Sequence, residues 1–343
     1  MKWPFQPWFS RDMAIDMGTS NTLMFLPRRG IVVHEPSMVA LHLKKEGKKR
    51  VVAVGGRAKN MLGRTPKNID VVQPIRKGIV SEFDVAVCML SRFLENVQGK
   101  TAFFKPRAVI STPVGTTEVE KRALRESVES ACMGEVFLIE QPMAAAIGAG
   151  LPITEPSGNM IVCIGGGTTE VAVISLGGIV HSHSIRLGGN HLDTAISSYI
   201  KKAHSMLVGD QTAEQIKIRL GLAMSDEELV SIKIKGRDLI AGVPRTGEIN
   251  NQEIREAMSE PVNAIVEAIR LGLERTPPEL ASDIVDKGIV LSGGGALLRN
   301  LDVAVQKETG VPVRLATDPT CETVLGAGKV LGQIDRLRQV LSH

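Results

Sequence analysis

Three short turns rich in glycine and threonine carry the residue types that bind phosphate oxygens. They are Asp16–Thr22, Ile164–Glu170 and Ser292–Ala296, and each follows an apolar run. The first two also precede an apolar run, which predicts two β-hairpins whose tips expose backbone N–H groups and hydroxyls. Two such hairpins about half a chain apart predict two halves that grip one polyphosphate, with the third turn closing the site.

The first turn combines phosphate donors with a carboxylate. Gly18 permits the tight turn, and Thr19, Ser20 and Asn21 offer side-chain donors. Asp16, at the end of the preceding strand, can hold Mg²⁺ through water because hard cations prefer oxygen ligands. Taken alone, Asp16 would more simply cap the turn. Beside a second glycine-threonine hairpin, a role at phosphate or metal is favoured.

The second turn brings backbone close to a ligand through Gly166 and Gly167, and Thr168 and Thr169 add hydroxyls. The pattern GxxxxGK[ST] of a P-loop is absent, because Gly326–Lys329 lacks the upstream glycine and the Ser/Thr. No GxGxxG opens a helix after a strand, so a Rossmann dinucleotide site is disfavoured.

Composition bounds the remaining possibilities. The 343 residues are too many for one ordinary core and predict two domains. A formal net charge of +4 with only 3% aromatic residues disfavours nucleic-acid binding. No apolar run is long enough to span a bilayer, and the N-terminus lacks the apolar core of a secretory signal. A disulfide framework or zinc site is not expected, and a reduced cytosolic compartment fits, because the cysteines are widely spaced without CxxC: Cys88, Cys132, Cys163 and Cys321.

Apolar periodicity predicts an α/β chain that positions these turns. Residues 13–26 and 161–174 echo each other, which suggests duplicated halves, and 151–158 is the expected interdomain linker. Residues 30–55 should form a small β-rich insertion. Helices are expected over 81–98, 114–131, 141–150, much of 185–223, 252–274, 297–309 and 321–341, and strands over 108–111, 136–140 and 232–250.

Two apolar segments at the surface favour a membrane interface. The first nine residues hold both tryptophans and two of the eight phenylalanines, which are costly to leave in water. The alternative is a terminal arm that packs on its own domain or a neighbour. Two further phenylalanines amid cations are either a second membrane tip or the entry to a strand. The candidate membrane residues are Trp3, Phe5, Trp8, Phe9, Phe103 and Phe104.

Five motifs occur in a characteristic order: Asp16–Thr22, Gln141–Gly148, Gly165–Val171, Thr212–Lys217 and Leu291–Leu298. Together they resemble the superfamily of actins, heat-shock chaperone ATPases and sugar kinases, and specifically the MreB-type bacterial actins. The resemblance extends from about residue 12 to 332 and is strengthened by 62–66, 140–152 and 277–284.

The resemblance implies an actin-like ATPase fold: a U-shaped α/β molecule of two duplicated RNase H-like domains, each with a smaller inserted subdomain, and ATP–Mg²⁺ in the central cleft. The implied partition is subdomain IA over 1–32, 76–144 and 322–343 (with a membrane segment over 1–11), IB over 33–75, IIA over 145–184 and 246–321, and IIB over 185–245.

The resemblance also implies roles for residues. The phosphates would lie between Thr19, Ser20 and Asn21 on one side and the second turn on the other. The nucleoside would contact residues 214–217 and 294–297, and Asp16 would hold the metal. The full set of nucleotide-binding residues that the resemblance implies is Gly18, Thr19, Ser20, Asn21, Gly166, Gly167, Thr168, Thr169, Glu214, Gln215, Ile216, Lys217, Gly294, Gly295, Ala296 and Leu297.

The biology implied is a cytoplasmic filament on the inner face of the plasma membrane. The family polymerises into double filaments, binds membrane directly through its N-terminal segment and an apolar loop, and organises the cell-wall elongation machinery of rod-shaped bacteria. For this chain the resemblance therefore implies self-association, membrane contact and a role in cell shape.

Two positions depart from the family pattern. Cys163 stands where the family usually has Asp, and a neutral thiol is a poor partner for Mg²⁺ or its water. Gln141 stands where the family usually has Glu, so it can position water by hydrogen bonds but cannot accept a proton as a base. With Gln141 and Thr168 as the catalytic candidates, we expect ATP binding with a weak ATPase at most.

Two other interpretations stay open at this stage. A hydrolysis-deficient paralogue that modulates another filament fits the two departures, whereas a small-molecule kinase of the superfamily is less consistent with the loss of both acids. A chaperone would need a further peptide-binding domain. We interpret His181, His183 and His191 as ordinary strand or loop residues and not as a metal cluster.

Overall fold

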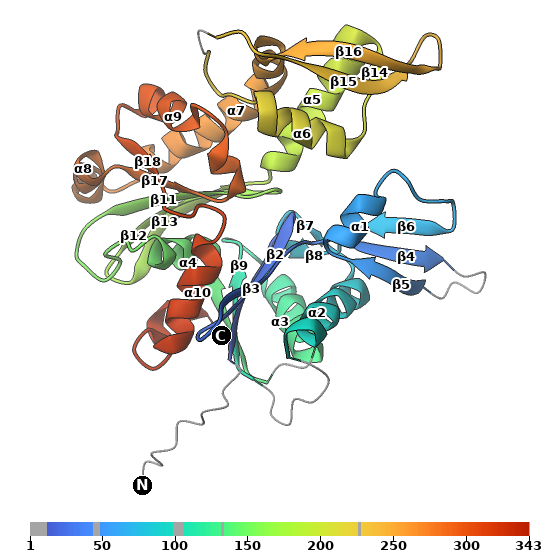
Figure 1. Cartoon of the computed structure of the whole chain (residues 1–343). Helices are drawn as coiled ribbons and strands as arrows, with labels where there is room; N and C mark the ends of the chain where they lie inside the picture. Colours follow the sequence, from blue (N-terminus) through green and yellow to red (C-terminus); the bar gives the residue numbers. More distant parts are fainter. Residues whose placement is uncertain (1–11, 44–48, 99–105, 132–133, 226–227, 343) are drawn as a thin grey trace. The chain divides into compact units, whose positions relative to one another are not determined.

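The chain divides into two compact units (Figure 1). The computed structural model describes residues 12–43, 49–98, 106–131, 134–225 and 228–342. Unit 1 comprises 1–152 and 321–343, and unit 2 comprises 153–320. The finer partition into four subdomains stays a prediction.

Unit 1 is built on a six-stranded sheet in the order β19-β10-β9-β1-β2-β3. The neighbours β1/β9 and β9/β10 are parallel, and the other pairs are antiparallel. The strands are β1 Met13–Met17, β2 Asn21–Leu26, β3 Gly30–Pro36, β9 Ala108–Thr112, β10 Val136–Glu140 and β19 Leu341–Ser342.

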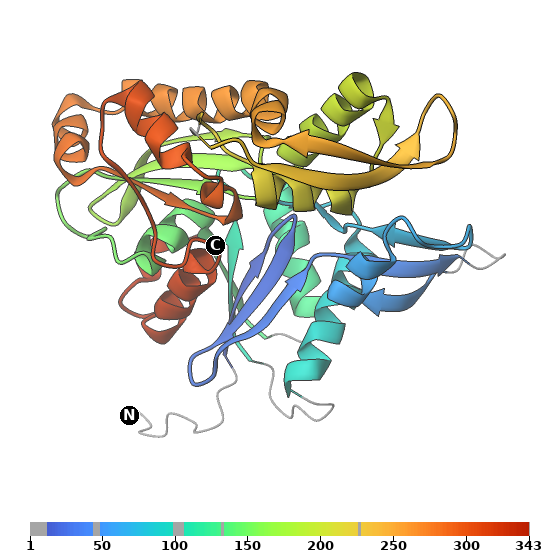
Figure 2. The same ribbon diagram turned by 45° about the horizontal axis from the view of Figure 1, so that its top comes forward.

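Helices cover both faces of this sheet, which explains why its central strands are apolar almost throughout. Met13, Ala14 and Ile15 are fully buried. One face packs on α2 (Phe83–Gln98) and α3 (Glu118–Ser130), and the other on α4 (Gln141–Gly148) and α10 (Glu322–Gly332), as Figures 1 and 2 show. The start of α3 is set by a capping box, in which Thr117 and Glu120 bond each other's backbone.

Smaller elements of unit 1 follow β3 along the chain. A three-stranded antiparallel sheet, in the order β5-β4-β6, carries one short helix, and a two-stranded ribbon follows. The elements are β4 Val39–Leu43, β5 Lys49–Val54, α1 Gly56–Met61, β6 Ile69–Val72, β7 Ile75–Arg76 and β8 Ile79–Val80.

Unit 2 repeats the topology of unit 1. Its sheet has the order β13-β12-β11-β17-β18, which matches β3-β2-β1-β9-β10 strand for strand in pairing direction. The strands are β11 Asn159–Ile164, β12 Thr169–Ser175, β13 Gly178–Ile185, β17 Ile289–Ser292 and β18 Val313–Leu315. The predicted duplication is confirmed at the level of strand order.

The helices of unit 2 pack their apolar faces on this sheet and on a small antiparallel sheet, β14-β15-β16. The long helix α7 begins at a capping box between Asn250 and Glu253. The elements are α5 Gly189–His204, β14 Met206–Leu207, α6 Asp210–Leu220, β15 Ser231–Asp238, β16 Pro244–Asn250, α7 Asn251–Glu274, α8 Pro278–Lys287, the 3₁₀ helix η1 Gly294–Leu297 and α9 Leu301–Thr309.

Two predicted helices were too long. The helix expected over 321–341 ends at Gly332, and Arg338–Val340 and β19 follow it. The helix expected from 297 begins at Leu301, because Gly294–Leu297 forms a separate 3₁₀ turn. Among the described residues, no helix combines the length and the apolar character needed to cross a bilayer.

Candidate functional site

The first turn joins β1 to β2 and is held by neighbouring segments. The Gly18 amide donates to the Asn21 carbonyl at 3.0 Å, which closes a four-residue tip. A Cβ at Gly18 would lie 2.9 Å from that same oxygen, so the turn requires glycine. The Thr19 hydroxyl accepts from the Gly78 amide at 2.8 Å and keeps its own proton for another acceptor. The Ser37 hydroxyl donates to the Gly18 carbonyl at 2.7 Å.

Asp16 and Gln141 lie at one edge of the sheet in unit 1. Asp16 is near the end of β1, and Gln141 directly follows β10 as the first residue of α4. Both strands run parallel to β9, so their carboxyl ends meet at the same edge, where ligands of open α/β sheets bind. The Ser111 hydroxyl of β9 donates to the Asp16 carboxylate at 2.6 Å.

The surroundings of Asp16 disfavour its charged form, because the effect of burial exceeds that of the hydrogen bond from Ser111. Burial raises the pKa of the Asp16 carboxyl above its ordinary value, and the hydrogen bond from Ser111 lowers the pKa by less. A cation or its water shell next to this carboxylate would favour the charged form. The residue type and its environment therefore fit a hard cation such as Mg²⁺.

Asp16→Asn is expected to stabilise the nucleotide-free protein in a chelator, by about 2 °C in Tm at about pH 7. The raised pKa means that the folded state carries a penalty for the charged carboxylate above that pKa. The penalty disappears as pH falls below the unfolded value of about 3.9, so the gain should vanish near pH 4. Thermal unfolding across this pH range measures it.

The exposed carboxylate Asp70 provides the matched control, and Asp70→Asn should leave Tm unchanged. A gain from Asp16→Asn that is as large at the acid end as at neutral pH would show that charge is not its cause.

The second turn joins β11 to β12 with the same closing bond. The Gly165 amide donates to the Thr168 carbonyl at 2.9 Å. The first amides of α5, from Gly189 and Asn190, donate to the carbonyls of Gly165 and Gly166, each at 2.9 Å. The carbonyls of the turn are therefore engaged.

The backbone N–H groups of the same turn, unlike its carbonyls, are free to bind a ligand. Within the described chain, the backbone N–H groups of Gly166, Gly167 and Thr168 donate no hydrogen bond. Successive unengaged amides in a tight turn form a concavity that binds anions. The second turn thus has the donor set that phosphate oxygens require.

The two threonines of this turn have different roles. The Thr169 hydroxyl is fully buried and donates to the Leu187 carbonyl at 2.8 Å, so it anchors the turn. The Thr168 hydroxyl donates to the buried Glu170 carboxylate at 3.3 Å. Of the two, Thr168 lies at the tip and keeps acceptor capacity for a metal-bound water.

Cys163 occupies the position in unit 2 that Asp16 has in unit 1. Each lies two residues before the first glycine of its turn. Each also adjoins a serine of the neighbouring parallel strand, Ser111 for Asp16 and Ser292 for Cys163. Cys163 is 1% exposed and directly opposite Glu170 on β12. The duplicated fold therefore places a carboxylate in one copy and a thiol in the other.

The third turn packs against the second within unit 2. The Gly293 amide donates to the Pro319 carbonyl at 2.6 Å, and a Cβ at Gly293 would lie 2.3 Å from the Ile164 carbonyl oxygen. A Cβ at Gly295 would lie 2.3 Å from the Ile164 side chain. These contacts bring Gly294, Gly295, Ala296 and Leu297 to the end of β11, where the second turn begins.

The candidate nucleoside residues Glu214–Lys217 lie on α6, and Lys217 links that helix to the second turn. Its Nζ pairs with the Asp193 carboxylate at 2.8 Å and donates to the Gly189 carbonyl at 2.9 Å. The Gly189 amide in turn holds Gly165. Ile216 belongs to the core of unit 2, whereas Gln215 is exposed.

Sequence reasoning missed this supporting role of Asp193 and of the first turn of α5. The glycine pair Gly188-Gly189 was the available signal. A Cβ at Gly188 would lie 2.4 Å from the Gly165 carbonyl oxygen, so only glycine allows α5 to start against the second turn.

The three histidines have local surroundings of their own. His181 and His183 lie on β13, and both are half-buried. Burial, together with Arg275 and His183, lowers the pKa of His181. His191 accepts the Gly188 amide at 3.2 Å and so caps α5. Across the described residues no group of three or more His, Cys, Asp or Glu side chains could hold a metal ion.

The candidate membrane residues Trp3, Phe5, Trp8, Phe9, Phe103 and Phe104 lie outside the described residues.

Comparison with known proteins agrees with the duplicated topology. The family model of the MreB/Mbl protein matches residues 10–339. The cell shape-determining protein MreB of Escherichia coli K12 is 50% identical over 334 residues, covering 96% of each chain. The cell shape-determining protein Mbl of Bacillus subtilis is 46% identical over 329 residues, covering 96% of this chain and 98% of that one.

Solved structures give the same result. MreB5 of Spiroplasma citri bound to AMPPNP matches with a TM-score of 0.91 at 33% identity, covering 96% of this chain and 98% of that chain. A MamK double helical filament matches in fold with a TM-score of 0.77 at 22% identity, covering 94% of this chain and 99% of that chain.

The two sheets have the same strand order, and in each a glycine-rich turn joins two inner strands. Together with the structural matches, this defines an actin-like ATPase fold. The match extends over nearly the whole chain. The chain belongs to the MreB/Mbl family of actin-like cytoskeletal proteins. The resemblance seen in the sequence is thereby confirmed.

Proposed function

We propose that this chain is an ATP-binding cytoskeletal protein that polymerises into membrane-associated filaments and helps to determine rod cell shape. The observation that carries the nucleotide part is the set of unengaged amides of Gly166, Gly167 and Thr168. Structures of MreB5 of Spiroplasma citri bound to AMPPNP and to ADP support it, at 33% identity.

The residues present fit ATP–Mg²⁺. The second-turn amides would hold phosphate oxygens, together with Thr19, Ser20 and Asn21 of the first turn. Asp16 would hold Mg²⁺ through water, and the ion would neutralise charge on the phosphates. The nucleoside would contact Glu214 and Lys217 of α6 and the third turn.

Hydrolysis would be slow. Gln141 has an amide where a general base would need a carboxylate, so it can orient a water molecule but cannot take its proton. Cys163 adds no charge beside the phosphates. We therefore expect nucleotide binding to control assembly, with a turnover that is weak at most.

Family membership supports filament formation, and the location at the membrane is part of the proposal. The curated relatives are named for cell shape, which supports a role in organising the cell-wall elongation machinery. The proposal includes double filaments, the inner face of the cytoplasmic membrane and the four-subdomain partition stated above.

Electron microscopy of the purified protein on anionic liposomes tests the whole proposal. We expect membrane-bound paired filaments with ATP–Mg²⁺ and none without nucleotide. Filaments that need no nucleotide would contradict nucleotide control of assembly. Absence of filaments in both conditions would favour a partner-dependent paralogue, the alternative suggested by Gln141 and Cys163.

Deleting residues 2–9 is expected to weaken liposome binding about tenfold or more, because four large aromatic side chains supply most of the membrane anchor. Polymerisation in solution should persist, since the segment precedes β1. Co-sedimentation with and without liposomes measures both. Unchanged liposome binding would leave Phe103 and Phe104 as the membrane contact.

A further inference from the structure

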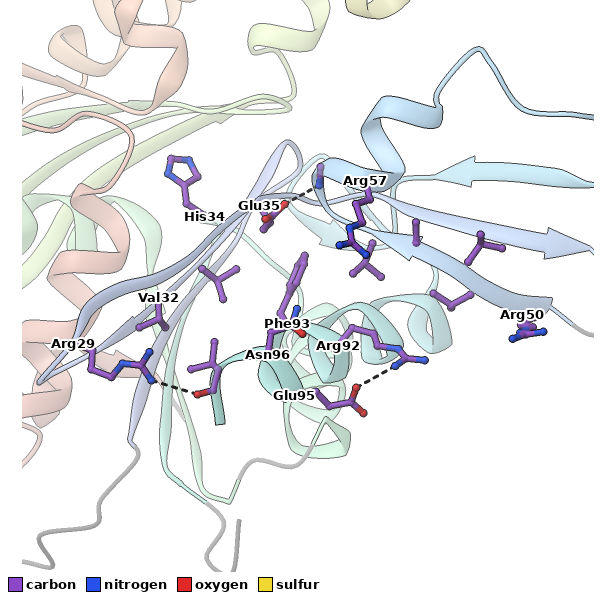
Figure 3. Close-up of a pocket in the computed structure, with 17 residues that line it drawn as sticks. Arg29, Val32, His34, Glu35, Arg50, Arg57, Arg92, Phe93, Glu95 and Asn96 are labelled. Carbon is purple, nitrogen blue, oxygen red and sulfur yellow. Dashed lines mark hydrogen bonds and ion pairs between the residues drawn. The ribbon is translucent and has the colours of Figure 1, made fainter. Parts of the chain in front are cut away.

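A groove in unit 1, away from the glycine-rich turns, has the features of a peptide-binding site. It is a cavity of about 780 Å³ between β3, β5 and α2, within the size range of ligand pockets. Figure 3 shows Phe93 extending from α2 into this space, with Arg57 beside it and Arg29 at the opposite end. We call it the arginine groove.

Two strand edges line the arginine groove. Residues 32–35 of β3 and 51–54 of β5 contribute consecutive positions to its lining. Since successive side chains of a strand point to opposite faces, consecutive lining residues indicate that the strand edge itself borders the cavity. In the described part of the chain, β3 and β5 are each the last strand of their sheet, so each has one unpaired edge.

The floor of the groove is apolar. Phe93 of α2 is 3% exposed and lines the groove, as does the buried Val33 of β3. On the β5 side, Val52 is 49% exposed, unusual for an apolar residue on an open edge. The groove therefore offers both backbone pairing and an apolar contact.

The charges of the groove are unbalanced toward arginine. Its two glutamates are engaged: Glu35 accepts the Gly56 amide at 2.7 Å, and Glu95 pairs with Arg92 at 3.2 Å. Arg29 donates to the Val97 carbonyl at 3.4 Å, and no carboxylate of the described residues pairs with its charge.

Two further arginines are more open still. Arg50 of β5 and Arg57 of α1 are exposed, and their guanidinium groups make no hydrogen bond or ion pair among the described residues. Guanidinium groups in this condition match carboxylates, which they bind in bidentate geometry.

We propose that the arginine groove binds an acidic, extended segment of a partner protein, which pairs with the free edge of β5. The six residues of β5 span about 20 Å, enough for a short strand. Alternate side chains of an added strand would meet the apolar floor and the arginines, as in strand-addition recognition. A free phosphate would use the arginines but not the floor or the edge.

The binding test uses a fluorescein-labelled peptide of alternating aspartate and valine, measured by anisotropy on the full-length protein. We expect saturable binding that a lysine–valine peptide of the same length does not show. The same aspartate–valine peptide with N-methylated amides should bind at least about tenfold more weakly, because it cannot pair with a strand edge. Equal binding of the N-methylated peptide would overturn strand addition.

A second experiment reverses the charge of two arginines in the groove. The double variant Arg50→Glu/Arg57→Glu should bind the peptide about tenfold or more weakly. The control Arg219→Glu/Arg314→Glu reverses two exposed arginines of unit 2 and should bind as the wild type does. Equal loss in both variants would show a general charge effect and overturn the site.

Two competitors separate the remaining sources of an anion. Inorganic phosphate and anionic phosphatidylserine vesicles should not displace the peptide at matched charge. Displacement by phosphate, or by vesicles, would overturn the peptide assignment in favour of a free anion or a lipid headgroup.

Discussion

Replacing Gly326 with alanine is expected to lower the free energy of unfolding by about 3 kcal/mol. A Cβ at Gly326 would lie 1.7 Å from the Ala144 carbonyl oxygen, and a Cβ at Gly148 would lie 2.0 Å from the Glu322 carbonyl oxygen. The helices α4 and α10 thus cross with their backbones in contact. No flexible side chain can move aside, so a helix must shift. Urea denaturation measures the loss.

The control lies on the same helix. A Cβ at Gly332, the last residue of α10, would meet no atom within 4 Å. Gly332→Ala should therefore be neutral, or should stabilise by up to about 1 kcal/mol through helix propensity. Equal behaviour of the two variants would show that the crossing tolerates a methyl group.

The loss at Gly326 has a consequence for the candidate site. Helix α4 begins at Gln141, and Lys329 of α10 donates to the Ile147 and Gly148 carbonyls at 3.0 and 2.8 Å. A shift of α10 would carry α4 with it. We expect residual Gly326→Ala protein to bind nucleotide more weakly than Gly332→Ala does.

Combining Gln141→Glu with Cys163→Asp is expected to raise ATP turnover about 100-fold, the range of a restored general base. The glutamate introduced at position 141 could accept the proton of the attacking water, and the aspartate introduced at position 163 could hold water of the metal shell. Phosphate release by the polymerising protein measures the rate. No rise in a folded, polymerising double variant would contradict the roles assigned to both positions.

One single variant and a surface control test the two positions separately. Cys163→Asp alone places a second carboxylate opposite the buried Glu170, so it should unfold more readily in a chelator and recover with ATP–Mg²⁺. Gln306→Glu, on the exposed face of α9, changes the same amide to an acid outside the three turns and should not alter turnover.

Local sequence determined the parts of this protein that depend on neighbours in the chain. Apolar runs flanking a glycine-threonine turn were sufficient to predict both hairpins, since each turn closes by one bond between residues three apart, Gly18 to Asn21 and Gly165 to Thr168. The strand Val136–Glu140 follows from a short continuous apolar run, and the helix over Phe83–Gln98 follows from a period of 3.6. The repeated motif likewise predicted the duplicated topology.

Only the tertiary structure decided which distant segments support those turns. Periodicity extended the last helix to residue 341, but α10 ends at Gly332 and the chain returns as β19 to pair with β10. Nothing local to Lys217 shows that it bonds Asp193 and Gly189, because the partners lie on another helix. The arginine groove is built from residues between 29 and 97.

The physical reason is the range of the interactions. Turn closure, capping and amphipathic patterning join residues a few positions apart, so the amino-acid sequence by itself determined the strands, the hairpins and the residue types offered to phosphate. Other contacts join residues far apart in the chain. They are the backbone contact at Gly326, the hydrogen bond between Asp16 and Ser111, and the pairing of Cys163 with Ser292 in unit 2. Those contacts form only when each sheet has packed with its own helices.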